Sequence, residues 1–144
     1  MALLSLSLAN QRHELKPARI SGRQRSTHGK EPVAVQLPVS SFQVLDWDTL
    51  PVTNHPGKIG FAEWRTMELG DVRVRQVEYS AGYLADHWCD RGHILYVLEG
   101  ELITELRDGR RYRLTAGMSY VVSNSGDAAH RSSTDIGAKL FIVD

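Results

Sequence analysis

The sequence is poor in cysteine, in long apolar runs and in any excess of charge, and each shortage excludes a class of protein. Cys89 is the single cysteine among 144 residues, so a scaffold held by intrachain disulfides is excluded. No stretch approaches the roughly 18 to 20 consecutive apolar residues of a membrane-spanning helix. Lys and Arg total 17 and Asp and Glu total 17, so no basic excess favours nucleic acid or a membrane surface. We expect a soluble, cytoplasmic protein with neither partner.

The remaining composition predicts one globular domain preceded by a tail. A chain of 144 residues with 42% hydrophobic and 24% charged residues fits a single domain with a packed core. Residues 1–40 carry six basic and two acidic side chains and no aromatic residue. This composition is typical of a disordered leader or an overlong gene start, and an organelle transit peptide is the alternative. The prediction is a disordered or leader tail over residues 1–40 and a single domain over residues 41–144.

The domain has the pattern of an all-β protein. From Phe42 onward, short β-rich runs are separated by Gly, Asn and Asp, and no stretch holds a helical period. Valines alternate with arginines over residues 72–75, which predicts a strand with one buried and one wetter face. Residues 93–99 are apolar at both parities, so we predict a strand covered on both sides that ends at Gly100. Asp108-Gly109 lies between two further runs and predicts a hairpin with a two-residue type I′ turn.

The spacing of these runs predicts a sandwich or a barrel. Runs over residues 118–122 and 138–143 complete about seven to nine strands. No helical segments are available to connect parallel strands, so a parallel α/β fold is excluded.

Four side chains have the chemistry and spacing of metal ligands: His87, Cys89, His93 and His130. On an extended strand, His87 and Cys89 leave the same face and can reach one ion. His93 follows a turn and can return toward the same point, whereas His130 must come from a distant strand. A lone histidine or cysteine is commonly a packing residue, but this polar cluster stands where strand alternation predicts apolar residues.

At these residues the sequence resembles the cupin superfamily. The first cupin motif is Gly, five residues, His-x-His, three or four residues, Glu, six residues and Gly. Here Gly82 leads by four residues, and His87, Cys89, His93 and Gly100 fall at the positions of the first His, the second His, the Glu and the closing Gly.

The second cupin motif also has a counterpart. Residues 117–122 resemble its opening and His130 stands for its histidine, although Ser123 replaces the family's proline and His130 comes two residues late. Residues 86–89 read Asp-His-Trp-Cys, similar to the small single-domain cupins named for an Asp-His-Cys-Trp motif. The resemblance covers about residues 42–144 and leaves the tail untouched.

The resemblance implies a double-stranded β-helix, a jelly-roll barrel with a metal cavity at one mouth. It implies no single reaction, since cupins include dioxygenases, isomerases, decarboxylases, sugar-binding modules and storage proteins. Cys89 and His93 replace the usual second His and Glu, and a thiolate favours Zn or Cu. We expect a divalent transition metal, Zn first, with Fe, Ni and Cu as alternatives. Four protein ligands would close a zinc site, whereas three would leave a position open.

Several other side chains are candidates for contacts around the metal. Asp86 and Asp90 flank the ligands and could bind a ligating imidazole N–H, or they could be turn residues on the surface. Gln76 and Glu78 share the parity of the valines at 72 and 74 and are predicted to extend the inner face into the cavity. The aromatic side chains of Trp64, Tyr96 and Tyr120 are assigned to core or dimer packing.

Two functions from different classes follow from these features. The first is a small metal-binding cupin that acts on or binds a small polar metabolite. The second is a non-catalytic ligand-binding or thiol-sensing cupin without catalytic metal, in which Cys89 responds. A metal-free structural module is a third possibility. A homodimer is expected because the doubly apolar run over residues 94–98 and the edge strands need cover.

Overall fold

The computed structural model describes residues 37–38, 41–124 and 128–144. The predicted tail over residues 1–40 therefore lies outside the described residues, apart from Leu37 and Pro38. In the described part, no helix has the length and apolar character needed to cross a membrane.

The domain is built from antiparallel strands, so the all-β prediction is confirmed. The elements of the described residues are the short 3-10 helix η1 (Trp47–Thr49) and the strands β1 (Val52–Pro56), β2 (Phe61–Leu69), β3 (Val72–Tyr79), β4 (His93–Leu106), β5 (Arg111–Thr115), β6 (Ser119–Val122), β7 (His130–Ser133) and β8 (Ala138–Val143).

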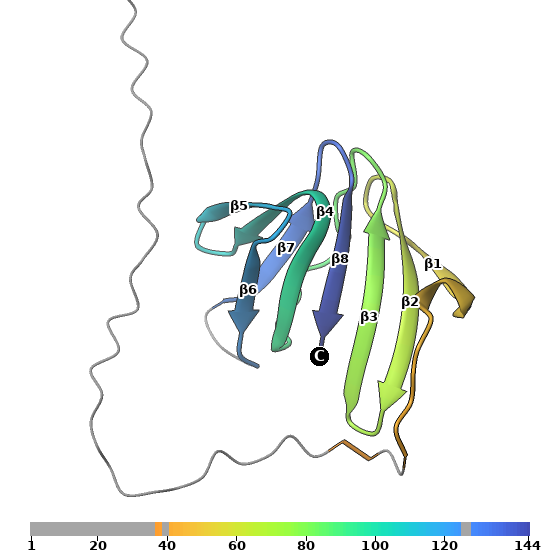
Figure 1. Ribbon diagram of the computed structural model, residues 1–144. Coiled ribbons are helices and arrows are strands. Elements are labelled where there is room, and N and C mark those ends of the chain that lie inside the picture. Colours follow the sequence, from red (N-terminus) through yellow and green to blue (C-terminus); the bar gives the residue numbers. More distant parts are fainter. Residues whose placement is uncertain (1–36, 39–40, 125–127) are drawn as a thin grey trace, which may run out of the picture. The chain divides into compact units, whose positions relative to one another are not determined.

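The strands form two sheets that share β4. The larger sheet has the order β1-β2-β3-β8-β4, and β6 pairs with the first residues of β4 (Figure 1). The smaller sheet consists of the second half of β4 between β5 and β7. Isolated bridges from Leu84 to Ser133 and from Cys89 to His130 add the segment before β4 to the free edge of β7. This pairing carries the predicted ligand segment to the smaller sheet, opposite β3 and β8.

Strand β4 runs through Gly100, where the sequence predicts a strand end. The register with β8 shifts between Val97 and Glu99, and Gly100 adopts a φ of 75°. A Cβ on Gly100 would overlap the carbonyl oxygen of Gly137, so the close pairing with β8 requires glycine. The prediction of a strand end was wrong because a glycine inside a strand can mark a bend between sheets as well as a terminus.

Gly100→Ala is expected to lower the free energy of unfolding by more than about 2 kcal/mol, because strain at positive φ adds to the overlap with Gly137. Gly109→Ala is the matched control, since Gly109 also has a positive φ of 91° but no atom lies within 4 Å of the added Cβ. Urea titration of both variants measures the difference. Equal losses in the two variants would mean that the approach of β8 at Gly100 does not matter.

The hairpin between β4 and β5 is present, but its turn differs from the predicted one. Gly109 N–H donates to the carbonyl of Leu106, so Arg107 and Asp108 are the central residues of the turn. Gly109 follows them in the left-handed conformation. This geometry belongs to longer hairpin loops, in which a turn is followed by a left-handed glycine.

The core lies between the sheets, and the first half of β4 is covered on one face within this chain. Leu95 and Val97 are buried, whereas Ile94 and Tyr96 are 53% and 42% exposed on the opposite face. A second copy that covers this outer face stays a prediction, which the molecular mass in solution tests. The largest fully buried apolar side chains among the described residues are Val77, Leu95, Val97, Leu102 and Leu140.

Candidate metal centre

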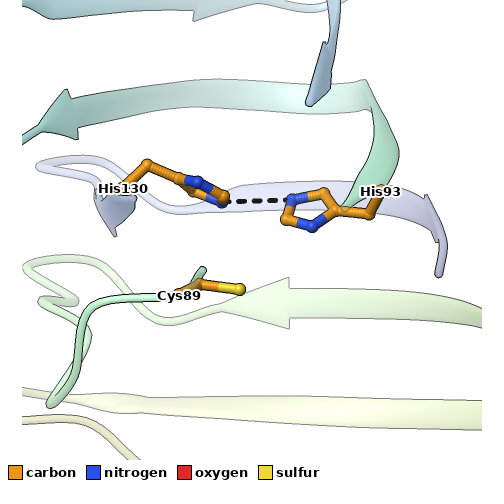
Figure 2. A group of neighbouring side chains, drawn as sticks. All are labelled: Cys89, His93 and His130. Atoms are coloured by element: carbon orange, nitrogen blue, oxygen red, sulfur yellow. Dashed lines mark hydrogen bonds between the residues drawn. The ribbon is translucent and has the colours of Figure 1, made fainter. Parts of the chain in front are cut away.

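Three of the four predicted ligands converge between the sheets. His93 is the first residue of β4, His130 is the first residue of β7, and Cys89 lies in the segment that precedes β4 (Figure 2). Cys89 and His130 are held together by their backbones, since Cys89 N–H donates to His130 O at 2.8 Å and His130 N–H donates to Cys89 O at 2.9 Å. The approach of Cys89 to His130 is therefore fixed by β pairing rather than by the side chains.

The distances in this group suit a metal ion. One donor atom from each of Cys89, His93 and His130 lies within 4.8 Å of the other two. The Nε2 atoms of the two histidines are 3.3 Å apart (Figure 2). Tetrahedral zinc with bonds of about 2.0 to 2.3 Å separates its ligand atoms by about 3.3 to 3.8 Å. The histidine pair already has this separation.

Backbone carbonyls orient both imidazoles. His130 Nδ1 lies 2.9 Å from the carbonyl of Ala128, and His93 Nδ1 lies 3.1 Å from the carbonyl of Arg91. A carbonyl only accepts hydrogen bonds, so each Nδ1 carries the proton and each neutral ring presents an Nε2 lone pair to the centre. The contact between the two Nε2 atoms is a hydrogen bond only when one ring is protonated. In the neutral rings two acceptors face each other, an arrangement that a bound cation favours.

The Tyr120 hydroxyl completes the contacts of His93. Tyr120, from β6, places its oxygen 2.8 Å from His93 Nε2. Burial raises the pKa of Tyr120, so the hydroxyl stays protonated and donates to this nitrogen. Because Nε2 has a single lone pair, the hydroxyl has to give up this bond when the nitrogen binds a metal ion. The sequence assigned Tyr120 to packing, and its spacing gave no signal of this contact.

Cys89 is poised as a thiolate. Hydrogen bonds with His130 and with His93 lower the pKa of the thiol to about 5, against the opposing effect of burial. A ring that donates such a bond carries a proton on Nε2 as well as on Nδ1. For His130, burial lowers the pKa, but the bonds to Cys89 and to the Ala128 carbonyl outweigh it and raise the pKa overall. At neutral pH the donor set is thus one anionic sulfur and two imidazoles, which suits a borderline transition metal.

Solved structures resemble the whole arrangement of strands, although no protein-family model and no curated protein sequence matches the chain. An RmlC-like cupin from Shewanella frigidimarina is 20% identical with a TM-score of 0.57, over 72% of this chain and 89% of that one. A sugar phosphate isomerase from a cupin superfamily, from Silicibacter pomeroyi, is 17% identical with a TM-score of 0.56, over 70% of this chain and 74% of that one. This chain has the cupin fold. A conserved protein of unknown function from Streptococcus pyogenes is 15% identical with a TM-score of 0.52, over 78% of this chain and 95% of that one.

The fourth predicted ligand of the cupin site, His87, lies outside the group of converging donors. Its side chain is 71% exposed, and its Nδ1 pairs with the carboxylate of Asp86. Asp86 contacts the imidazole of His87 and none of the three converging donors. Asp90 is exposed. The converging donors therefore number three among the described residues, although His87 does line the same cavity.

The inner face of β3 has the opposite parity from the prediction. Arg73, Arg75 and Tyr79 line the cavity, so Gln76 and Glu78 belong to the other face of the strand. Glu78 pairs there with Arg65 and with Lys139 at 3.4 Å each. The prediction for Gln76 and Glu78 was wrong because it took the valines at 72 and 74 to mark the inner face. In this cupin barrel the arginines turn inward instead.

The cavity beside the three ligands has a volume of about 320 Å³. It lies between the larger sheet and the segment that carries Cys89. Arginines and aromatic residues, absent from the predicted site, make up much of its wall. Its lining includes Trp64, Arg73, Arg75, Tyr79, Tyr83, His87, Cys89, Arg91, His93, Tyr120, His130 and Asp144.

Proposed function

We propose that this chain is a metal-binding cupin that holds one transition-metal ion with Cys89, His93 and His130 and binds a small molecule beside it. The convergence of three donor atoms from separate segments of the chain within 4.8 Å carries the proposal. Three protein ligands leave a coordination position for water or a ligand. The adjoining cavity of about 320 Å³ is large enough for a small metabolite.

Zinc is the proposed metal, with Fe, Ni and Cu as alternatives, because thiolate and imidazole are borderline-to-soft donors. When bound, such an ion supplies a Lewis acid that polarises a coordinated oxygen or water. The chain itself contributes the fixed Nδ1–H tautomers of His93 and His130. It also places the Tyr120 hydroxyl beside this centre, where the hydroxyl can donate to a bound ligand once His93 Nε2 coordinates the metal.

The metal content of the protein purified without added metal tests this function. Elemental analysis is expected to find one ion per chain in the unaltered protein and almost none in Cys89→Ser. His87→Ala is the matched variant and should keep its ion, because His87 is exposed and paired with Asp86. A metal-free protein that also fails to take up added Zn²⁺ would overturn the proposal. Loss of the ion in His87→Ala would instead show a closed site with four ligands.

Thiol sensing is the second candidate function, and the setting of Cys89 favours it. The sulfur is half-buried, lines the cavity and has a pKa of about 5, so it is a thiolate at neutral pH. A low-pKa thiolate in an accessible cavity reacts readily with electrophiles and oxidants. Purified protein that lacks metal, does not bind Zn²⁺ and is rapidly alkylated at Cys89 by iodoacetamide would favour this function over the first.

A further inference from the structure

We propose that the ligand of this cavity is an anion, carrying a carboxylate or a phosphate, and that Arg73, Arg75 and Arg91 bind its charge. The inference deepens the proposed function by naming the class of molecule that would lie beside the metal. The inference rests on the proposed function only for the presence of a metal ion, because the arginines line the cavity with or without an ion.

The charges of the lining are unbalanced. Three arginines line the cavity, and Asp144 carries the one carboxylate side chain among the described lining residues. The Cys89 thiolate adds a second negative charge, which a divalent cation bound there would more than neutralise. A cavity with a net positive wall concentrates small anions and favours their binding.

Arg75 is a buried cation with spare hydrogen-bonding capacity. Its side chain is 9% exposed, and its guanidinium lies over the Trp64 ring at 4.3 Å from the centroid. One terminal nitrogen, Nη2, donates to Asp144 at 2.8 Å. Its Nε finds no hydrogen-bond partner among the described residues. This nitrogen has almost no exposed surface, so an anion in the cavity would meet the terminal nitrogens of Arg75 rather than its Nε.

Asp144 shows how a carboxylate fits against these arginines. Arg73 donates two hydrogen bonds to this carboxylate, from Nε to Oδ1 at 3.1 Å and from Nη2 to Oδ2 at 2.6 Å. This two-point geometry is the one in which arginine recognises carboxylates and phosphates. Asp144 neutralises one of the two guanidinium charges that it contacts, so the pair keeps a positive charge for a second anion.

Arg91 is the third arginine of the lining. Its side chain is exposed, and none of the ion pairs among the described residues includes it. Arg91 and Arg73 also line an adjoining cavity, together with three acidic residues: Glu68, Asp71 and Asp144. The backbone carbonyl of Arg91 accepts the Nδ1–H of His93. Arg91, which would contact the anion, thus also belongs to the turn that orients His93.

The arginines and the metal ligands lie within electrostatic range of each other. Arg73, Arg75 and Arg91 line the same cavity of about 320 Å³ as the three proposed ligands. An anion held by the arginines would therefore lie in the field of the metal centre, where another of its oxygens can approach the open coordination position.

Isothermal titration of the full chain with inorganic phosphate and with acetate, at constant ionic strength, tests the inference. The titrations use protein stripped with a chelator and protein loaded with Zn²⁺, so that binding by the arginines is separated from binding by the metal. At least one of the two anions is expected to bind the stripped protein. The anion that binds more tightly shows whether the cavity prefers a phosphate or a carboxylate. Arg91→Ala should weaken this binding by about tenfold, the loss of one charge-assisted hydrogen bond.

Arg110→Ala is the matched control, because Arg110 is an exposed arginine that pairs with Asp108 and lies outside the cavity lining. Arg75→Lys keeps the charge but loses the planar fork, and it should also weaken binding. Failure of both anions to bind the stripped protein, or equal affinities in the Arg91 and Arg110 variants, would overturn the inference. Anion binding by a protein that takes up no Zn²⁺ would leave the inference standing and refute the proposed metal function.

Discussion

His130→Ala is expected to lower the affinity of the chain for Zn²⁺ by at least about 100-fold. Loss of a group that only orients a ligand costs about 10- to 100-fold in metal affinity, and loss of a donor costs more. The fold should survive, because the pairing of β7 with the Cys89 segment uses backbone hydrogen bonds of 2.8 and 2.9 Å. Competition with a chromophoric chelator measures the affinity, and circular dichroism checks the fold.

His55→Ala is the control for the loss of an imidazole. His55 stacks on Trp64 with ring centroids 3.8 Å apart and belongs to β1, away from the three donors. Its removal should leave Zn²⁺ affinity unchanged. Substitution with cobalt adds a spectroscopic readout, since a thiolate-to-metal charge-transfer band reports Cys89 directly. An unchanged affinity in His130→Ala would show that this histidine is no ligand.

Local spacing was enough to predict that Cys89, His93 and His130 come together. Three donors came from residues whose chemistry is rare in the body of a strand, and polar residues on a β-rich chain stand out. The place of His93 after a turn and the place of His130 on a distant strand both follow from an antiparallel fold. The exposure of His87 did not follow, because the segment from Asp86 to Cys89 is held by isolated bridges rather than by a regular strand.

The arginines were missed for a different reason. Alternation fixes which residues of β3 share a face, but it does not say which face is inside. The valines at 72 and 74 made one face look buried, whereas Arg73 and Arg75 are inside because Asp144 and Trp64 receive their guanidinium groups. Asp144 lies more than 60 residues away in the sequence, so a single chain read by itself does not reveal this pairing.

Asp144→Ala is expected to lower the free energy of unfolding by about 3 kcal/mol at neutral pH, because it leaves two guanidinium groups without their shared carboxylate. Burial raises the pKa of Asp144, but hydrogen bonds from Arg73 and the charge of Arg75 outweigh it and lower the pKa overall. A carboxylate with a lowered pKa stabilises the fold above its unfolded pKa of about 3.9, and this contribution is lost as pH falls through the folded value. Urea titrations should therefore show a large difference from the unaltered protein at pH 7 that shrinks below about pH 4.

Asp108→Ala is the matched control for this prediction, because Asp108 also pairs with an arginine but its side chain is 47% exposed. An exposed pair contributes little to stability, so the loss should be small at every pH. If Arg73 and Arg75 bind anions as proposed, added acetate should restore part of the stability of Asp144→Ala, because a ligand that binds the folded state alone stabilises it by mass action. Acetate should have no such effect on Asp108→Ala. If Asp144→Ala is as stable as the unaltered protein, the two guanidinium groups remain solvated without the carboxylate. The prediction that the buried ion pair stabilises the fold would then be wrong, and acetate would have no lost stability to restore.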